Sequence, residues 1–366
     1  MTGLLDLKVN RDGINLDCWL VGGEYRRLKP PCLPYFFTST VNPAKPPAMM
    51  RLLGECHSRP FEKVEKREVW TEQCSTVYGI EQRRDLVVGM EDNVRFIERL
   101  CIDYGFENLV VPSDLSVVGF DIECESKSGQ FPNPKNEFDP LTAFSVFGNC
   151  SDNSRTSERC FTGDESDILK NAVEEIQWLN PDVLCTYSGT GIDYEYPLVR
   201  AHVLGRAFRI GRQRDEPFIA RSTYRRKFFE RTETTTYLKG RLCMDVYNEV
   251  LVDTSLTGLR RTLKVVGRHF FAGQGFDIVE EDRMLLKQLS PAQLSRYCLS
   301  DARLAYHLGM HYLGAVCSLA RKYSVPLSAM VHRKPSHTGN LIYGRGFREL
   351  GIVSDGSNRD RLRDTR

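Results

Sequence analysis

The sequence predicts an α/β protein in which a β-rich α+β amino-terminal part precedes a domain of alternating strands and helices. Short apolar segments, interrupted by Pro and Asn, fill about the first hundred residues. Farther along, strand-like runs alternate with amphipathic helical patterns, which is typical of one sheet with helices against it. At 366 residues the chain is long enough for two or more compact domains.

Composition places the chain among ordinary globular proteins. It is 41% hydrophobic and 27% charged, which excludes collagen-like and wholly disordered classes. No apolar run reaches the roughly 18 residues of a membrane helix, and the first residues do not resemble a secretory signal. We therefore expect an intracellular protein. The twelve cysteines form no C-x-x-C pair, and we expect reduced, structural thiols.

The elements follow from local patterns. Residues 92–104 are predicted to form a helix, because apolar residues recur there at helical spacing. The run "VVGFDIEC" (117–124) and "LTAFSVFG" (141–148) indicate strands. An amphipathic helix with start and stop signals covers 164–180.

The alternation continues toward the carboxyl end. A strand is predicted at 182–189 and a helix at 194–205, followed by a polar insertion over 211–240. The segment "GRLCMDVYNEVL" comes next. Further helices are predicted over 290–324, opened by a Ser-Pro start signal.

Four carboxylates and a tyrosine stand out. Asp121 and Glu123 end an apolar strand and are separated by one residue, so both side chains leave the same face. Asp193 follows the end of a later strand, at the edge where α/β sheets usually place their sites. Tyr297 and Asp301 are four residues apart, which stacks them on one helix face.

Carboxylates at the end of a buried strand need compensation, and a bound cation provides it. Hard oxygen ligands suit Mg²⁺ or Mn²⁺, and two such ions about 3.5–4 Å apart clamp the attacking and leaving oxygens of a phosphoryl displacement. Each piece alone is weak, since a lone D-x-E is more often a solvated strand end. The order and context of the pieces carry the specificity.

These motifs resemble the amino-terminal part of family B DNA polymerases, of the archaeal type. "GFDIE", "TYSGTGIDYEYPL" and "YCLSDA" are similar to the three exonuclease motifs of that family. "LPYFF", "NPDVLCTYSG", "GRLCMDVY" and "SHTGNLIYGRGFRELG" are similar to further blocks, so that the resemblance covers nearly the whole chain. It implies a ribonuclease H-like exonuclease domain of the DEDDy type, with a mixed sheet flanked by helices.

The resemblance also implies roles for the five residues. Asp121 and Glu123 would bind the catalytic metals, Mg²⁺ or Mn²⁺, and Asp301 would complete the tighter site. Asp193 would hold the second ion partly through water. Tyr297 would position the attacking water.

Two positions depart from the family pattern. The second motif has Ser188 where the family has Asn, and Ile192 where it has a bulky aromatic residue. Ser188 can still bind DNA by a hydrogen bond, but with shorter reach.

In this family the insertion between the second and third motifs carries a hairpin that helps to separate the primer end from the template. "RSTYRRKFFERTETTTYLKG" fits that role. Arg225, Arg226 and Lys227 are available for phosphates and Tyr224 for base stacking. A solvated basic hairpin explains each of these residues equally well.

The resemblance implies an amino-terminal domain over 1–115, an exonuclease domain over 116–320, and a helical segment over 321–366 that leads toward an absent palm. We therefore expect no polymerase active site in this chain, and the amino-terminal subunit of a split polymerase, an excised fragment and a truncated paralogue would each explain its absence. The expected partners are DNA, through the primer 3′ end and the template strand, a separate chain with the palm and thumb, and a sliding clamp. The two functional hypotheses are a proofreading 3′–5′ exonuclease and a non-catalytic module that binds template or assists assembly.

Overall fold

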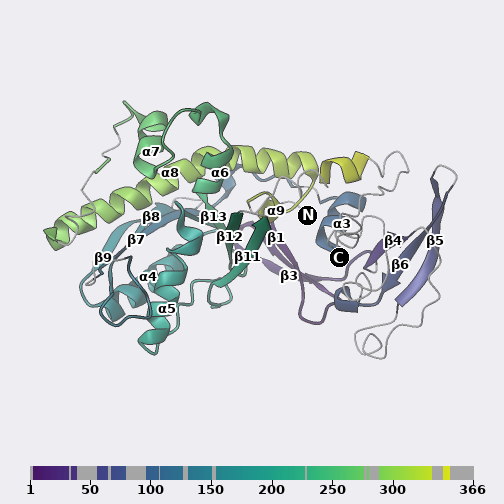
Figure 1. Ribbon diagram of the computed structural model, residues 1–366, viewed down its shortest axis with the longest axis horizontal. Coiled ribbons are helices and arrows are strands. Elements are labelled where there is room, and N and C mark those ends of the chain that lie inside the picture. Colours follow the sequence, from purple (N-terminus) through teal and green to yellow (C-terminus); the bar gives the residue numbers. More distant parts are fainter. Residues whose placement is uncertain are drawn as a thin grey trace. The chain divides into compact units, whose positions relative to one another are not determined.

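The computed structural model describes residues 3–32, 34–38, 56–64, 67–79, 96–106, 108–126, 131–150, 154–226, 229–275, 278–279, 288–331 and 341–346. The chain divides into two compact units. One comprises residues 1–19, 25–108 and 319–366, and the other comprises residues 20–24 and 109–318. Most of their helices and strands are labelled in Figure 1. The three-part division drawn from the resemblance stays a prediction.

The first unit is rich in strands, as the sequence predicts. One antiparallel pair joins β2 (Leu16–Leu20) to β3 (Tyr25–Leu28), and β1 (Leu4–Val9) completes that sheet on the other side of β2. A second sheet has the order β4-β6-β5, formed by Tyr35–Thr38, Arg67–Cys74 and Cys56–Val64. Helices α3 (Phe96–Asp103) and α9 (Leu327–Val331) accompany the sheets.

Two sequence expectations for this unit need comment. Helix α3 falls within the predicted range 92–104, of which residues 92–95 lie outside the described part. The expectation that all cysteines are reduced is wrong for Cys74, which is disulfide-bonded. Spacing along the chain gave no sign of this bond, because a disulfide depends on how the strands pair rather than on a local C-x-x-C motif.

The second unit is built on a five-stranded mixed sheet in the order β13-β10-β7-β8-β9. Strands β13 (Leu242–Asp245), β10 (Val183–Thr186) and β7 (Val117–Cys124) run parallel. Strand β8 (Leu141–Asn149) runs antiparallel to β7 and to the edge strand β9 (Thr156–Thr162). The predicted α/β fold class with a mixed sheet is thereby confirmed, although β9 was not predicted.

Helix α4 (Glu165–Leu179) packs against β8 and β9. Its start is fixed by Asp164, whose side chain accepts hydrogen bonds from two backbone N–H groups of the first turn, and its end by Asn180 in the left-handed conformation. Its apolar stripe meets the inner face of the sheet, where Phe120 and Phe144 stack with ring centroids 5.3 Å apart.

Further helical elements of this unit lie among its described residues. They are η3 (Gly189–Gly191), α5 (Glu195–Val203), α6 (Val246–Val252), η4 (Thr254–Leu256) and α7 (Leu263–Phe271). Near the start of β7, Pro112–Asp114 form the short helix η2. Residues Val21–Gly23 form another, η1.

A single helix, α8 (Pro291–Tyr323, 33 residues), replaces the several helices predicted over 290–324. It crosses β7 at close range, because a side-chain Cβ on Gly119 would lie 2.3 Å from the carbonyl oxygen of Ala302 and 2.7 Å from the backbone nitrogen of Tyr306. Gly119 is thus what allows helix and strand backbones to touch. None of the described helices is long and apolar enough to span a bilayer.

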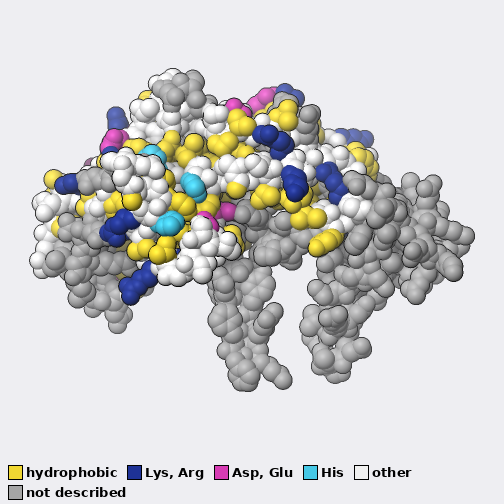
Figure 2. Space-filling model, turned by 90° about the horizontal axis from the view of Figure 1, so that it is seen from above, with side chains coloured by type: hydrophobic (Ala, Val, Ile, Leu, Met, Phe, Trp, Pro, Cys, Tyr) yellow, Lys and Arg dark blue, Asp and Glu magenta, His cyan; other side chains and the backbone are white. Residues whose placement is uncertain are grey.

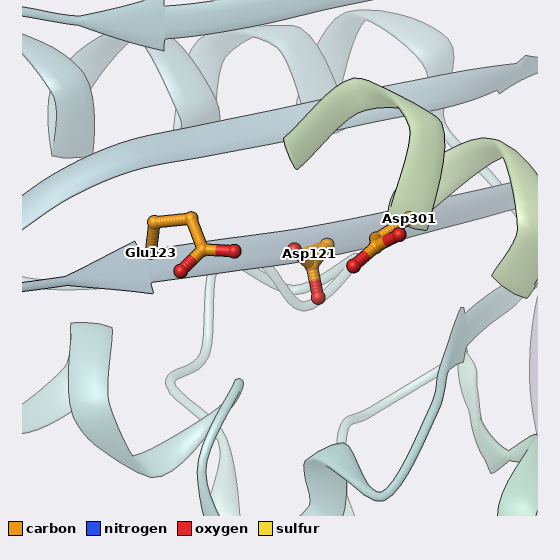
Figure 3. A group of neighbouring side chains, drawn as sticks. All are labelled: Asp121, Glu123 and Asp301. Carbon is orange, nitrogen blue, oxygen red and sulfur yellow. The ribbon is translucent and has the colours of Figure 1, made fainter. Parts of the chain in front are cut away.

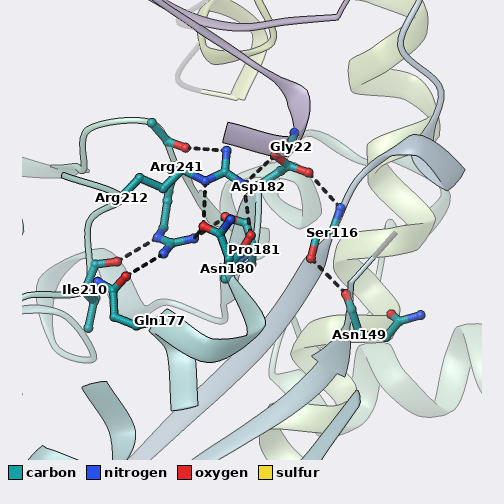
Figure 4. Close-up of polar contacts among 11 residues, drawn as sticks. Gly22, Ser116, Asn149, Gln177, Asn180, Pro181, Asp182, Ile210, Arg212 and Arg241 are labelled. Carbon is teal, nitrogen blue, oxygen red and sulfur yellow. Dashed lines mark hydrogen bonds and ion pairs between the residues drawn. The ribbon is translucent and has the colours of Figure 1, made fainter. Parts of the chain in front are cut away.

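Polar contacts stabilise the amino ends of the parallel strands (Figure 4). Fully buried Asp182, just before β10, accepts hydrogen bonds from the backbone N–H groups of Ser116 and Gly22, each at 2.9 Å, and from Arg212 Nη2 at 2.8 Å. Buried Arg241, before β13, donates to the Ile210 carbonyl at 2.8 Å. The opposite, carboxyl ends of these strands are therefore left for a functional site.

Candidate active site

Three carboxylates converge where α8 crosses β7 (Figure 3). Asp121 and Glu123 project from β7, and Asp301 approaches from α8. One oxygen from each lies within 4.8 Å of the others. The two-residue repeat of the strand sets the first pair, and the helix crossing brings the third. The structure thus places three of the four predicted acids in one group.

The electrostatics of this group favour a cation. Burial raises the pKa of Asp121 well above its ordinary value, and the charges of Asp301, Glu123 and Asp193 raise it further. Nearby positive charge favours the ionised form of a carboxyl group and would reverse this effect. Clustered carboxylate oxygens are the donors that Mg²⁺ and Mn²⁺ prefer, so these residues fit the predicted ions.

Asp193 lies beside the cluster rather than in the group of three. It follows η3 on the loop that leads into α5 and is only 7% exposed. Burial raises its pKa well above the usual value, and the charges of Asp245, Glu123 and Asp301 contribute in that order. The fourth predicted acid is therefore within electrostatic reach of the others.

Asp245 holds the loop that presents Asp193. Its Oδ1 accepts a hydrogen bond from Ser188 N at 2.7 Å, and its Oδ2 accepts from Thr190 Oγ1 at 3.0 Å. Under this loop, a Cβ on Gly189 would lie 2.2 Å from Asp193 Oδ2. Sequence reasoning gave Asp245 no role, although an Asp before the helical pattern "VYNEVL" is a recognisable helix start.

Tyr297 and Asp301 share one face of α8, as their spacing predicts, and are 6% and 7% exposed. The structure adds Lys264 of α7, which sequence reasoning missed. Its Nζ lies 3.2 Å from Asp301 Oδ1, 3.7 Å from the centre of the Tyr297 ring, and donates to the Val279 carbonyl at 2.6 Å. The partly buried ammonium thus neutralises part of the acidic charge. No sequence motif quoted above includes it.

The predicted DNA-binding residues are only partly described. The insertion forms a hairpin, in which β11 (Phe218–Arg226) pairs antiparallel with β12 (Phe229–Tyr237). Lys227 and the side chains of Tyr224, Arg225 and Arg226 lie outside the described residues. Their proposed contacts with DNA therefore stay a prediction.

At its base the hairpin is joined to the Asp193 loop. Thr236 Oγ1 donates a hydrogen bond to the Thr190 carbonyl at 3.3 Å, and Arg221 forms an ion pair with Glu195 at the start of α5. Thr190 and Glu195 lie on either side of Asp193 in the sequence. The hairpin and the loop of the candidate site are thus mechanically linked.

The two positions that depart from the family pattern face solvent. Ser188 is exposed and has a left-handed backbone, with φ of 62°. Ile192 is 37% exposed. Both lie on the loop that carries Asp193, so either side chain is accessible to a bound strand.

Basic side chains do not form one broad patch on the face shown in Figure 2. Among the described residues, Lys and Arg side chains are scattered there between apolar and uncharged ones. The net charge of the whole chain is only +2. Affinity for a polyanion would therefore depend on local clusters.

Comparison with known proteins relates this chain to one family. Residues 102–266 match the family model described as DNA polymerase family B, exonuclease domain. A DNA polymerase of Thermococcus kodakarensis is 24% identical over 343 residues, a match that covers 84% of this chain and 19% of that protein. For a DNA polymerase of Pyrococcus glycovorans the values are 23% over 343 residues, with 84% and 41% covered.

The fold has a counterpart among solved structures. The family B DNA polymerase from the hyperthermophilic archaeon Pyrobaculum calidifontis is similar with a TM-score of 0.71 at 19% identity, over 96% of this chain and 51% of that chain. The chain spans less than half the length of the two curated relatives named above. The matched residues 102–266 include Asp121, Glu123 and Asp193, whereas Tyr297 and Asp301 lie beyond them.

Proposed function

From the premise that this chain is related to family B DNA polymerases and contains their exonuclease domain, we propose that it is a 3′–5′ exonuclease that removes mispaired nucleotides from DNA. The group of Asp121, Glu123 and Asp301 carries the proposal. Three carboxylates with oxygens within 4.8 Å are unfavourable unless positive charge compensates them. Divalent ions held there would supply the chemistry of phosphodiester hydrolysis.

Each residue has a part in this reaction. When bound, two ions of Mg²⁺ or Mn²⁺ supply an activated water and stabilise the developing charge on the phosphate oxygens. Asp121, Glu123 and Asp301 would hold the ions, and Asp193 would complete the second position from its loop. Tyr297 orients the attacking water through its hydroxyl group. The ammonium of Lys264, stacked on the Tyr297 ring, keeps that ring in place.

The DNA strand is proposed to reach this site along the hairpin. Arg225, Arg226 and Lys227 would bind phosphates and Tyr224 would stack on a base. Ser188 would donate a hydrogen bond near the 3′ end. Support comes from the base of the hairpin, which is joined to the Asp193 loop by Thr236.

The second candidate function is a non-catalytic module that binds template or assists assembly of a replication complex. One observation favours it. Ser188 stands where the resemblance expects the longer Asn, and its exposed hydroxyl group has less reach toward a primer end. Weaker binding of the primer 3′ end would allow the chain to bind DNA without cleaving it efficiently.

Incubation of the purified chain with a 3′-labelled single strand and Mg²⁺ or Mn²⁺ tests the proposal. We expect stepwise release of mononucleotides, abolished in the double variant Asp121→Ala, Glu123→Ala. Glu174→Ala is the matched control, because this exposed acid lies on α4 and outside the carboxylate group. Absence of cleavage by the unmodified chain, with DNA binding retained, would favour the non-catalytic module.

We also propose that the protein acts inside the cell at the nucleoid, with a separate chain that carries the polymerase palm and thumb and with a sliding clamp. The support comes from its relatives, which are named DNA polymerases. Capture of proteins on the tagged chain, identified by mass spectrometry, tests this. Recovery of neither partner would contradict it.

A further inference from the structure

Two thiols meet beside the carboxylate group, and the proposed hydrolysis uses neither of them. Cys298 lies on α8, directly after Tyr297, and is fully buried. Cys160 lies on the edge strand β9 and is partly exposed. Both thiols lie next to Ser145 of β8, and neither is in a disulfide.

The strand register explains how these thiols come together. Asp121 of β7 pairs with Ser145 of β8, which in turn pairs with Cys160 of β9. Paired residues project from the same face, so the three side chains form a row under α8. Cys298 lies over this row, with its Sγ 3.1 Å from Ser145 Oγ and 3.4 Å from the Asp121 carbonyl oxygen.

Solvent reaches the two thiols unequally, and this difference suits a reaction in two steps. Cys160 is the thiol that solvent can reach, and α8 contributes both of its side-chain partners, Cys298 and Ser295. The hydrogen bond from Cys298 lowers the pKa of Cys160, and a larger thiolate fraction makes it the better nucleophile. Cys298 is buried directly behind it as a resolving thiol.

We propose that Cys160 and Cys298 are a peroxide-reactive pair that closes to a disulfide between β9 and α8. The Cys160 thiolate attacks a hydroperoxide oxygen, becomes a sulfenic acid, and releases water or an alcohol. Cys298 sulfur then attacks the Cys160 sulfur, which forms the S–S bond and releases a second water. Two thiols are oxidised and one peroxide is reduced, so no further reactant is needed.

The bond would change the exonuclease site, a consequence that rests on the proposed function. A disulfide requires its sulfurs to be about 2.05 Å apart, closer than any hydrogen-bonded contact. Closing the bond draws the two thiols together, and the part of this movement made by Cys298 takes it away from Ser145 and the Asp121 carbonyl. Tyr297 is its neighbour in sequence and Asp301 lies one turn farther along α8, so both are displaced with it. We expect oxidation to lower the hydrolysis rate at least tenfold.

Peptide mapping of the full chain tests the pair without reference to activity. The reduced protein is treated with stoichiometric hydrogen peroxide, and the expected product is a Cys160–Cys298 crosslinked peptide that disappears on reduction with dithiothreitol. Cys160→Ser and Cys298→Ser should each abolish it. Cys243→Ser is the matched control, since this buried thiol lies on β13 and should leave the crosslink intact.

The outcomes separate this inference from the proposed function. Sulfinic or sulfonic acid at Cys160 without the crosslink would overturn the pair, whatever the nuclease activity. A crosslink in a chain that never cleaves DNA would support the pair and contradict the exonuclease. In the hydrolysis assay, peroxide should inhibit the unmodified chain and spare Cys160→Ser. Equal inhibition of the unmodified chain and of Cys160→Ser would overturn the proposed link between the thiol pair and the exonuclease site.

Discussion

Replacement of Asp121 by Asn is expected to stabilise the metal-free protein. Without metal, carboxylate oxygens of Asp121, Glu123 and Asp301 lie within 4.8 Å of one another. At an effective dielectric constant of about 20, two unit charges at that separation repel by about 3.5 kcal/mol. Proton uptake and the ammonium of Lys264, 3.2 Å from Asp301, relieve part of this repulsion. We therefore expect the free energy of unfolding to rise by about 1–3 kcal/mol at neutral pH.

The sign of the pH dependence follows from the raised pKa of Asp121. Its folded-state pKa lies above the unfolded value of 3.8, so its contribution to stability is fully present below that pH. The contribution is lost as pH rises through the folded-state pKa. Because Asn does not titrate, the advantage of the variant should grow as the pH rises above the unfolded-state pKa of 3.8.

Urea unfolding in EDTA and in Mn²⁺ measures both effects. Mn²⁺ at one hundred times its dissociation constant should stabilise the unmodified chain by about 2.7 kcal/mol and Asp121→Asn by clearly less. Glu174→Gln, an exposed acid on α4, should respond to Mn²⁺ as the unmodified chain does. If Asp121→Asn were less stable in EDTA at about pH 8, or bound Mn²⁺ as well, the charge-repulsion reasoning would be refuted.

Three further substitutions test other parts of the structure. Gly119→Ala places a Cβ 2.3 Å from the Ala302 carbonyl oxygen. Urea unfolding should show that the free energy of unfolding falls by about 2–3 kcal/mol. Unchanged stability would mean that α8 can move away. Lys264→Met removes the cation next to Asp301. The acidic limb of the pH–activity profile should therefore shift up by about one pH unit. An unshifted limb would contradict the role of Lys264 in neutralising the acidic charge. Asp182→Ala leaves the buried Arg212 side chain without its carboxylate partner. The free energy of unfolding in urea should fall by about 3–5 kcal/mol. A fall below about 1 kcal/mol would show that water replaces the contact.

Local patterns in the sequence predicted most of the second unit. Helix α4 was predicted to within one residue at each end, because Asp164 and Asn180 fix its ends through contacts within a few residues. The edge strand β9 was not predicted, since Thr156–Thr162 has the polar composition of a loop. It is a strand because β8 pairs with it.

The sequence by itself determined which residues are candidates for the site. The spacing of Asp121 and Glu123 sets a common strand face, and that of Tyr297 and Asp301 sets a common helix face, because both depend only on local backbone geometry. Only the tertiary structure decided that α8 crosses β7 at Gly119, and that Lys264 and Cys160 lie beside the same site. Such contacts join segments far apart in the chain, and packing of whole elements, rather than any local periodicity, sets their distances.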